Sequence, residues 1–442
     1  MLQKINGRPS AACQLLKDAH YPSLFPSTLE FSPPARGTWN IVHTGMQLPE
    51  SHQIYICASG CVRGVVLTAA EMGAMDRFST IEIHENDLVD KDNEAFLIEG
   101  ISDILARLPK LPRAVFVFPA CVHHFLGVNF RYVYRVLRAR WPQIDFLECF
   151  MDPIRQTRSI TPEQRERREI YRQLRKRPLN PRAANLLSSN LPTDPDSELV
   201  RLFTDNGWIL RDMTTCRTYD EFQQMGEGSL DLWYHPFGGP AAAEDAKRRG
   251  AVSLYVGQPW RPAEIKESLN AVRRAMHLPA SDWAEAAARA KQALDRAKKL
   301  LGTTPIALDY AAVFRPFSLA RLLVESGFRV TKIYADSCMP DDAEDFRWLQ
   351  QNAGTIELWA TKHPDMRLLR RGSEKGPLLA IGQKAAYFNQ TKHFVNLIEG
   401  GGLYGFTGIA KLAERMVDAF RQEKPIEENI RTKGLGGPCC LC

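Results

Sequence analysis

Two cysteines stand where a strand is expected to lead into a helix, and their thiols could bind iron. Cys61 follows the apolar segment QIYICASG, and Cys121 follows the apolar segment AVFVFPA. In a parallel α/β sheet, functional groups gather beyond the carboxyl ends of the strands. The positive end of a helix dipole also favours the thiolate form of a cysteine, which is the form that binds metal. We therefore take Cys61 and Cys121 as candidate ligands of one metal cluster.

The other cysteines have a weaker claim to a metal. Four that lie near expected strand ends are Cys57, Cys149, Cys216 and Cys338. Core packing is the default interpretation for these four, because free cysteine is among the most buried residue types. Cys57 lies four residues before Cys61 and is the strongest further candidate among them. Three more lie close together at the C-terminus: Cys439, Cys440 and Cys442. A loosely ordered tail is one interpretation of this segment, and metal delivery or binding of an extra cluster is the other.

Two adjacent histidines, His123 and His124, follow Cys121 directly. In an extended segment their side chains would point to opposite faces, so a single zinc ion bound by both is not indicated. One of them could line a substrate pocket. The sequence has no G-x-S-x-G motif, so acyl-transfer chemistry has no support.

A glycine-rich segment from Glu399 to Gly405 contains the spacing G-x-G-x-x-G after an apolar segment at 394–398. A dinucleotide site needs a following β–α–β unit and an acidic residue about twenty positions later. Only one helix is expected before the polar tail, so a nucleotide site is not favoured. The motif G-x-x-x-x-G-K-[ST] is absent, so any ATP hydrolysis in this system belongs to another protein.

The elements that must position these residues repeat in the order strand, loop, helix and strand. The clearest units have strands at 53–57, 114–118, 183–188 and 306–310 and helices at 61–72, 129–139, 196–205 and 317–325. Gly73, Gly207 and Gly327 follow three of these helices, as expected for left-handed C-caps. Strands that alternate with helices predict parallel sheets with right-handed crossovers.

A chain of 442 residues is too long for one hydrophobic core. We predict an α/β fold of three Rossmann-like domains. The first, 1–180, carries the cluster cysteines, the second covers 181–300, and the third, 301–442, ends in a tail rich in glycine and cysteine.

Composition and local sequence restrict where the protein is expected in the cell and what it is expected to bind. No apolar run is long enough to span a membrane, and the N-terminus lacks the apolar region of a signal peptide. A cytoplasmic protein is therefore expected, in which ten cysteines are thiols or metal ligands rather than disulfides. Positive charge gathers between Arg155 and Arg182, where an exposed, solvated helix is the default interpretation. No nucleic-acid-binding module is present, so neither a nucleic acid nor a membrane is expected as partner.

Together these features resemble component 1 of the nitrogenase family, the reductase half that accepts electrons from an ATP-dependent iron protein. Cys61, after a glycine-containing turn and before a helix, resembles the family's second iron-binding cysteine. Cys121 precedes HHFLGVNF and resembles the third, which precedes GLIGDD, and ENDLV at 85–89 lies where the family has EKDIVFGG. The blocks AANLLSSN, PIALDY and GLYGFTGIAKLAERM follow in the family's order.

The resemblance implies an iron–sulfur cluster at the interface with a homologous sister subunit. In the family, a first iron-binding cysteine precedes the one that Cys61 resembles. The corresponding stretch of this chain, residues 38–56, contains no cysteine. Cys13, in AACQLL, resembles the family's ACQPLGA and is preferred to Cys57 as the third ligand beside Cys61 and Cys121. A four-iron cluster ordinarily takes four cysteines, so the sister subunit is expected to supply what this chain lacks.

In the family's catalytic chains, a cysteine of the second domain and a histidine of the third hold an iron–molybdenum cofactor. His235 stands near the place of that cysteine. Phe394 and Val395 stand near the place of that histidine, with His393 close by. The chain is therefore expected to be a sister subunit without this cofactor or a member with a different active site, with room for a second metallocofactor in the inter-domain pocket.

His235 is the candidate catalytic residue. It ends an apolar strand, and the loop PFGGP after it has little bulk near the backbone, which leaves space for a ligand. An imidazole can bind a metal or donate a proton near neutral pH, whereas a lone histidine is as often a hydrogen-bonded core residue.

The function expected from the resemblance is that of a subunit of a nitrogenase-like reductase. Its substrate would be an unsaturated tetrapyrrole, a carbon–sulfur bond or another inert small molecule, and an enzyme of the methylthio-alkane reductase type would fit. Two alternatives remain: a non-catalytic scaffold that builds or carries a metallocluster, and a ligand-binding protein of the same fold without metal.

Overall fold

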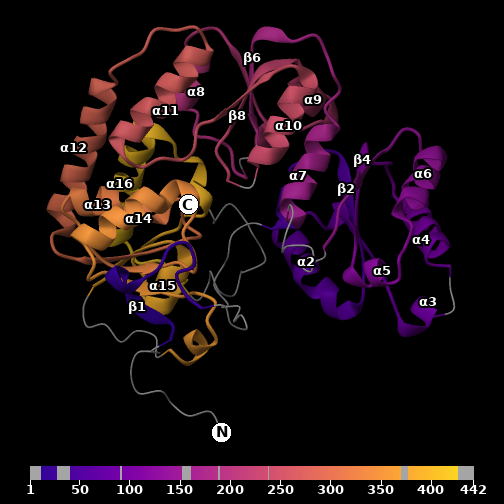
Figure 1. The fold of residues 1–442 in the computed structure, drawn as a ribbon, viewed down its shortest axis with the longest axis horizontal. Coiled ribbons are helices and arrows are strands. Elements are labelled where there is room, and N and C mark those ends of the chain that lie inside the picture. The colour runs from indigo at the N-terminus through magenta and orange to yellow at the C-terminus, as the bar shows by residue number, and fades with distance from the viewer. Residues whose placement is uncertain are drawn as a thin grey trace.

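The computed structural model describes residues 11–26, 40–89, 92–151, 161–187, 190–236, 238–369 and 377–426. Its strands form three sheets flanked by helices, so the chain has the α/β fold that the alternating pattern predicts (Figure 1). The division into three domains at 180 and 300 stays a prediction. The first two sheets each lie within one of the predicted domains, whereas the third draws in a strand from the N-terminal segment.

The first sheet is parallel, with the strand order β3-β2-β4-β5, and forms the right-hand unit in Figure 1. Its strands are β2 (Ser51–Cys57), β3 (Phe78–Glu82), β4 (Ala114–Pro119) and β5 (Asp145–Glu148). The helices of this region are α1 (Ile41–Met46), α2 (Ser59–Glu71), α3 (Glu85–Val89), α4 (Asn93–Arg107), α5 (Cys121–Phe125) and α6 (Phe130–Arg140). All residues of β2 and β4 are buried, because both faces of these central strands are covered.

The second sheet is also parallel, in the order β7-β6-β8-β9. Its strands are β6 (Asn180–Leu187), β7 (Ile209–Asp212), β8 (Gly228–Trp233) and β9 (Val252–Tyr255). The helices around it are α7 (Pro162–Arg172), α8 (Glu198–Thr204), α9 (Tyr219–Gln224), α10 (Gly239–Arg249) and α11 (Pro262–Ala275). The long helix α12 (Ala284–Leu301) then leads to the third sheet and packs along the last helix, α16 (Gly405–Arg421).

The third sheet has the order β1-β12-β11-β10-β13-β14. Its strands are β1 (Cys13–Leu15), β10 (Pro305–Asp309), β11 (Arg329–Tyr334), β12 (Glu357–Trp359), β13 (Leu379–Ile381) and β14 (Phe394–Val395). Its remaining helices are α13 (Pro316–Glu325), α14 (Ala343–Asn352) and α15 (Gln383–Asn389). β1 is the exception to the parallel prediction, since it pairs antiparallel with β12.

The basic stretch contains the helix α7, but this helix is not a solvated one as its charge predicts. α7 contacts both α1 and α10, and Glu166 and Arg167 are almost completely buried, with 0% and 1% of their surface exposed. Ile170 and Tyr171 belong to the core of the first sheet. The charge pattern gave a wrong prediction because α1 and α10 cover the helix and Arg167 has buried polar partners. No helix among the described residues has the length and apolar character needed to cross a bilayer.

Candidate functional site

The structure places Cys61 and Cys121 after neighbouring strands at one edge of the first sheet. β2 and β4 are paired in parallel up to Ile56 and Pro119, and the Ala120 amide still donates to the Ile56 carbonyl at 3.0 Å. Cys61 lies in the first turn of α2 and is exposed, and Cys121 is the first residue of α5 and is half-buried. Both thiols are therefore accessible at the edge that the sequence predicts.

Cys57 is less suited to metal binding than its neighbour Cys61. It is the last residue of β2 and is fully buried. Burial raises the pKa of the Cys57 thiol to about 12, and the proximity of Cys61 adds to this shift. The thiol form is therefore favoured, and thiol is not the form that binds iron.

Cys13 does not lie at this edge. It is in β1, paired with Trp359 of the third sheet, and packs against the core of that sheet. The antiparallel pairing of β1 with β12 thus holds Cys13 in another sheet than Cys61 and Cys121, and its role as the third ligand stays a prediction. The C-terminal cysteines, Cys439, Cys440 and Cys442, lie outside the described residues.

His123 and His124 lie in the short helix α5 rather than in an extended segment. His123 is buried with its Nδ1 atom 3.1 Å from the Ala120 carbonyl oxygen, and burial lowers its pKa. The ring of His124 packs against Phe130 and Phe150. Both histidines therefore pack within the first unit, and neither lines the pocket that contains His235.

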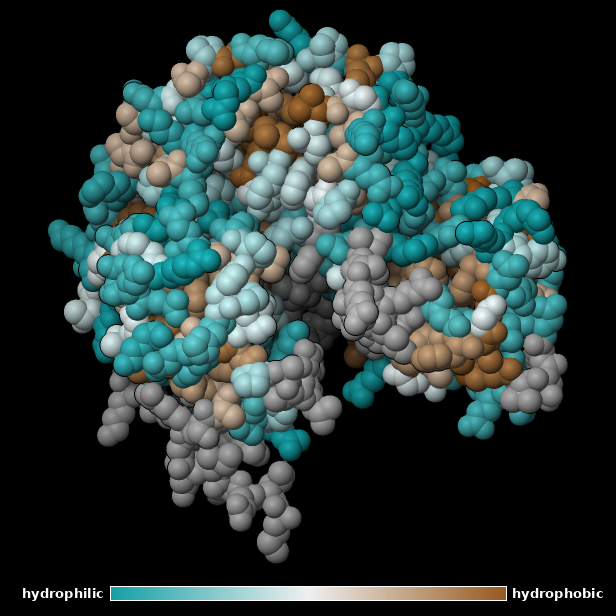
Figure 2. Space-filling view, in the orientation of Figure 1, coloured by the Kyte–Doolittle hydropathy of each residue, from teal (hydrophilic) through white to brown (hydrophobic). Residues whose placement is uncertain are grey.

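Apolar side chains are exposed on the helices that carry the two cysteines. Leu67 of α2 is 51% exposed, and Phe125 and Leu126 at the end of α5 are 75% and 43% exposed. Figure 2 shows apolar surface over the region of α5. Exposed apolar patches on soluble proteins commonly mark interaction sites.

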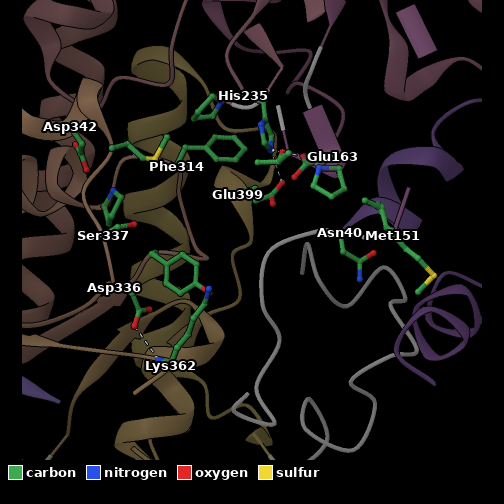
Figure 3. A pocket seen from close by; sticks show the side chains of 17 residues that line it. Asn40, Met151, Glu163, His235, Phe314, Asp336, Ser337, Asp342, Lys362 and Glu399 are labelled. Carbon is green, nitrogen blue, oxygen red and sulfur yellow. Dashed lines mark hydrogen bonds and ion pairs between the residues drawn. The ribbon is translucent and has the colours of Figure 1, made fainter. Parts of the chain in front are cut away.

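A second candidate site is a pocket of about 610 Å³ that takes residues from all three sheet regions. Its lining includes Asn40, Met151, Glu163, His235, Phe314 and Glu399. Figure 3 shows His235 between Glu163 and Glu399, with the Phe314 ring beside it. The pocket is mostly apolar, and Glu163 and Glu399 lie with the imidazole at one end, whereas Asp336 and Asp342 line the pocket on the other side (Figure 3). A mostly apolar lining with a few polar groups is the usual make-up of a small-molecule site.

His235 follows β8 at its carboxyl end and is 2% exposed. Its Nε2 atom lies 3.8 Å from Glu163 Oε1 and 4.0 Å from Glu399 Oε2, and its ring meets Phe314 edge-on at 4.5 Å between centroids. Burial lowers the pKa of His235 well below its usual value, and the Arg167 guanidinium lowers it further. The neutral form of the imidazole is therefore favoured.

A chain of polar contacts connects the two carboxylates that face His235. Arg167 Nη2 donates to Glu163 Oε1 at 2.8 Å and also to Asn190 Oδ1. Asn190 Nδ2 in turn donates to Glu399 Oε2 at 2.6 Å. The guanidinium and the amide thereby fix both carboxylates, which come from α7 and from the segment before α16. The sequence analysis missed this network because its members are far apart along the chain.

The glycine-rich segment positions Glu399 and packs the third region against the second. A Cβ atom on Gly402 would collide with the Pro192 carbonyl oxygen, and one on Gly400 would collide with the Gln258 side chain. The amides of Glu399 and Gly400 donate to backbone carbonyls at 2.8 and 2.7 Å. These amides are therefore engaged within the protein, which explains the glycines without a nucleotide. In the sequence, this glycine-rich motif was the signal that could have identified Glu399 as a residue of the site.

The pocket residues do not fit a second metallocofactor. Among the described residues that line the pocket there is no cysteine, and His235 is the only histidine. The Nε2 atom of that imidazole already faces two carboxylates. Among the described residues, no group of three or more histidines, cysteines, aspartates or glutamates is arranged to hold a metal ion. The two thiols at the edge of the first sheet, in contrast, are of the kind that iron–sulfur clusters require.

Comparisons with known proteins agree with this fold. The chain matches the family described as nitrogenase component 1 type oxidoreductase over residues 43–421. A solved structure described as nitrogenase Cp1 at pH 6.5 has a TM-score of 0.66 at 12% identity, covering 90% of this chain and 94% of that chain. A structure described as nitrogenase Cp1 at pH 5 has a TM-score of 0.58 at 12% identity, with coverage of 94% and 96%.

No curated protein sequence matches the chain. At 12% identity the two solved structures show the fold alone. The family match covers most of the chain, and it is what assigns the relationship. The chain belongs to the nitrogenase component 1 type oxidoreductase family.

Proposed function

We propose that the chain is one subunit of a nitrogenase-like reductase that takes electrons from an ATP-dependent iron protein and reduces an inert small molecule. The observation that carries this proposal is the pair Cys61 and Cys121 at one exposed sheet edge, in a chain of this family. The pocket between the three sheet regions supplies a separate place for a substrate.

Cys61 and Cys121 are the residues that would hold an iron–sulfur cluster in this chain. Such a cluster supplies one-electron transfer at a potential set by its burial and by hydrogen bonds to its sulfurs. The chain's own contribution is to hold two thiols in place, each fixed by a helix that begins at the end of a buried strand. Because a four-iron cluster ordinarily takes four cysteines, a homologous sister subunit provides the remaining ligands.

A stable oligomer is the expected state of the cluster-bearing protein. We expect an oligomer because this chain has too few cluster ligands and because Leu67, Phe125 and Leu126, on the helices that carry the two cysteines, are exposed. Sedimentation of the chain co-expressed anaerobically with its sister subunit should show an αβ or α₂β₂ complex. A monomer that carries a full cluster would contradict the shared site. Phe125→Asp should weaken the complex, and Ile209→Asp, at an exposed apolar residue of the second sheet, serves as the matched control.

Electron acceptance distinguishes the enzyme from a scaffold. The purified complex is mixed anaerobically with reduced iron protein and MgATP, and oxidation of the iron protein is followed by its absorbance. A reductase subunit should oxidise the iron protein only when ATP is present. A scaffold for metallocluster assembly should give no such oxidation and should instead pass its cluster to an acceptor protein.

The matched control for this experiment is the complex that carries Cys121→Ser. Without the cluster there is no electron acceptor, so ATP-dependent oxidation should disappear. Equal oxidation with the unaltered and Cys121→Ser complexes would show that the electrons enter elsewhere.

A further inference from the structure

The helix α7 packs between the first two sheet regions and forms one wall of the pocket. It contacts α1 of the first region and α10 of the second. The first turn of α7 lines the pocket with Pro162 and Glu163, and the start of α1 lines it with Asn40 and Ile41. Asn40 and Glu163 lie on the same side of the pocket in Figure 3. Separation of α1 from α7 would therefore open the pocket on this side.

Glu166 of α7 lies in the contact between these two helices. It is completely buried, with 0% of its surface exposed. Within the described part of the chain, no group makes a hydrogen bond to either of its carboxyl oxygens. A Cβ atom on Gly45 of α1 would lie only 2.5 Å from Glu166 Oε1, so the two helices approach closely at this point. Buried polar groups are nearly always hydrogen-bonded, so this exception requires an explanation.

The nearest donors to Glu166 are bound to other groups. Gln53 Nε2, which is 2.6 Å from the same Cβ position on Gly45, donates to the Val42 carbonyl at 3.0 Å. The neighbouring guanidinium of Arg167 donates to Glu163 at 2.8 Å. Glu166 thus has no hydrogen bond that would stabilise a negative charge at this position.

Burial raises the pKa of Glu166 well above its ordinary value. The Arg167 guanidinium lowers this pKa and the Glu163 carboxylate raises it, but burial has the largest effect. The other elements packed around α7 bring these titratable or charged side chains: His43 from α1, Tyr55 and Cys57 from β2, Cys149 after β5, and Glu244, Asp245 and Arg248 from α10. The cation in this list, Arg248, is ion-paired with Asp245. The protonated form of Glu166 is therefore favoured in the closed structure.

We propose that the contact between α1 and α7 is a pH-sensitive closure of the pocket, which is held while Glu166 carries its proton and opens when Glu166 ionises. A carboxylate that is buried without a partner is too costly to persist. Its ionisation is therefore coupled to separation of the two helices, which lets water reach the charge. Because Glu163 and Asn40 move with these helices, the pocket opens at the same time. The closure is independent of the proposed reductase function and requires no metal.

The closure weakens as the pH rises. In the open state water reaches Glu166, and its pKa is near the ordinary value of about 4.3. Above that pH the closed state binds one proton more than the open state, until the raised pKa of the closed state is reached. Opening is therefore favoured by up to about tenfold for each pH unit within this window. Below the window the carboxyl is protonated in both states, and opening does not depend on this residue.

The test compares amide hydrogen exchange in the unaltered protein and in Glu166→Gln, measured by mass spectrometry on the anaerobically purified complex. The two proteins are compared at equal pH, because the chemical rate of exchange itself depends on pH. Glutamine has nearly the same size but cannot ionise. Exchange in α1 and α7 should therefore be faster in the unaltered protein, and the ratio of the two rates should rise with pH by up to about tenfold per unit. Glu166→Asp keeps an acid and should keep the pH dependence.

Two controls show whether the effect is specific to this contact. Glu414→Gln, at an exposed glutamate of α16, should exchange like the unaltered protein at every pH. Exchange in α14, which packs in the third sheet region, should not differ between the unaltered protein and Glu166→Gln. Denaturant unfolding should show that Glu166→Gln folds and that its advantage in stability over the unaltered protein grows with pH.

The proposal is overturned if the ratio of exchange rates in α1 and α7 stays constant with pH. Faster exchange in Glu166→Gln than in the unaltered protein would overturn it as well, since Glu166 would then be an ionised residue that Arg167 stabilises. An equal rise of the ratio in α14 would show that the whole molecule opens rather than the contact between α1 and α7, which also contradicts a local closure.

Discussion

Replacing Cys61 or Cys121 by serine is expected to remove the bound iron and the brown colour of the anaerobically purified protein. Each thiol would be half of what this chain contributes to the cluster, and a serine hydroxyl is a poor ligand for iron in an iron–sulfur cluster. Both cysteines are accessible at the sheet edge, so the substitutions remove ligands without opening a cavity in the core. Iron content per chain and the visible absorption spectrum measure the effect.

Another cysteine provides the control for this experiment. Cys216→Ser changes a half-buried thiol near the second sheet, and this variant should keep its iron. Full iron content in both Cys61→Ser and Cys121→Ser would show that the cluster assignment is wrong. Loss of iron in Cys57→Ser would instead add a third ligand to the same edge.

Arg249→Leu is expected to lower the free energy of unfolding by about 3–5 kcal/mol, because it leaves buried carboxylates without their partner. Arg249 is fully buried and pairs with Asp231 of β8 and, at 2.7 Å, with Asp245 of α10. It also donates to the Gly228 carbonyl at 3.0 Å. A leucine fills part of the space but satisfies none of these acceptors.

The matched control is Arg201→Leu, whose ion pair with Asp196 is 59% and 57% exposed. Exposed pairs contribute at most about 1 kcal/mol. Denaturant unfolding, followed by circular dichroism, measures the free energy of unfolding of both variants. The unfolding transition of the second sheet region is compared between them. Equal stability of the two variants would mean that Asp231 and Asp245 find water or other donors once Arg249 is gone.

The elements around the candidate sites could be predicted because each depends on local pattern. The apolar run before Cys61 became β2, and the apolar run before Cys121 became β4, which ends two residues before this cysteine. Parallel strands that are neighbours in a sheet end at the same edge, so the two cysteines could be expected together. The fold class followed from the same alternation of strands and helices.

Other features depended on contacts between distant segments. Cys13 lies in the third sheet because β1 pairs with β12, more than three hundred residues later. α7 is buried despite its charge because α1 and α10 cover it. His123 and His124 lie in a helix where an extended segment was expected, since α5 begins as soon as β4 ends.

The sequence by itself determined the α/β class, the strands that lead to Cys61 and Cys121, and the family resemblance that the comparisons then confirmed. These follow from periodicity and local order, which are properties of short segments. Only the tertiary structure decided what surrounds His235. Glu163, Arg167, Asn190 and Glu399 come from separate segments, and their hydrogen bonds form only when the three regions pack together. The spacing of these residues along the chain does not predict that their side chains are in contact, because their burial and the distances between them are set by the whole fold.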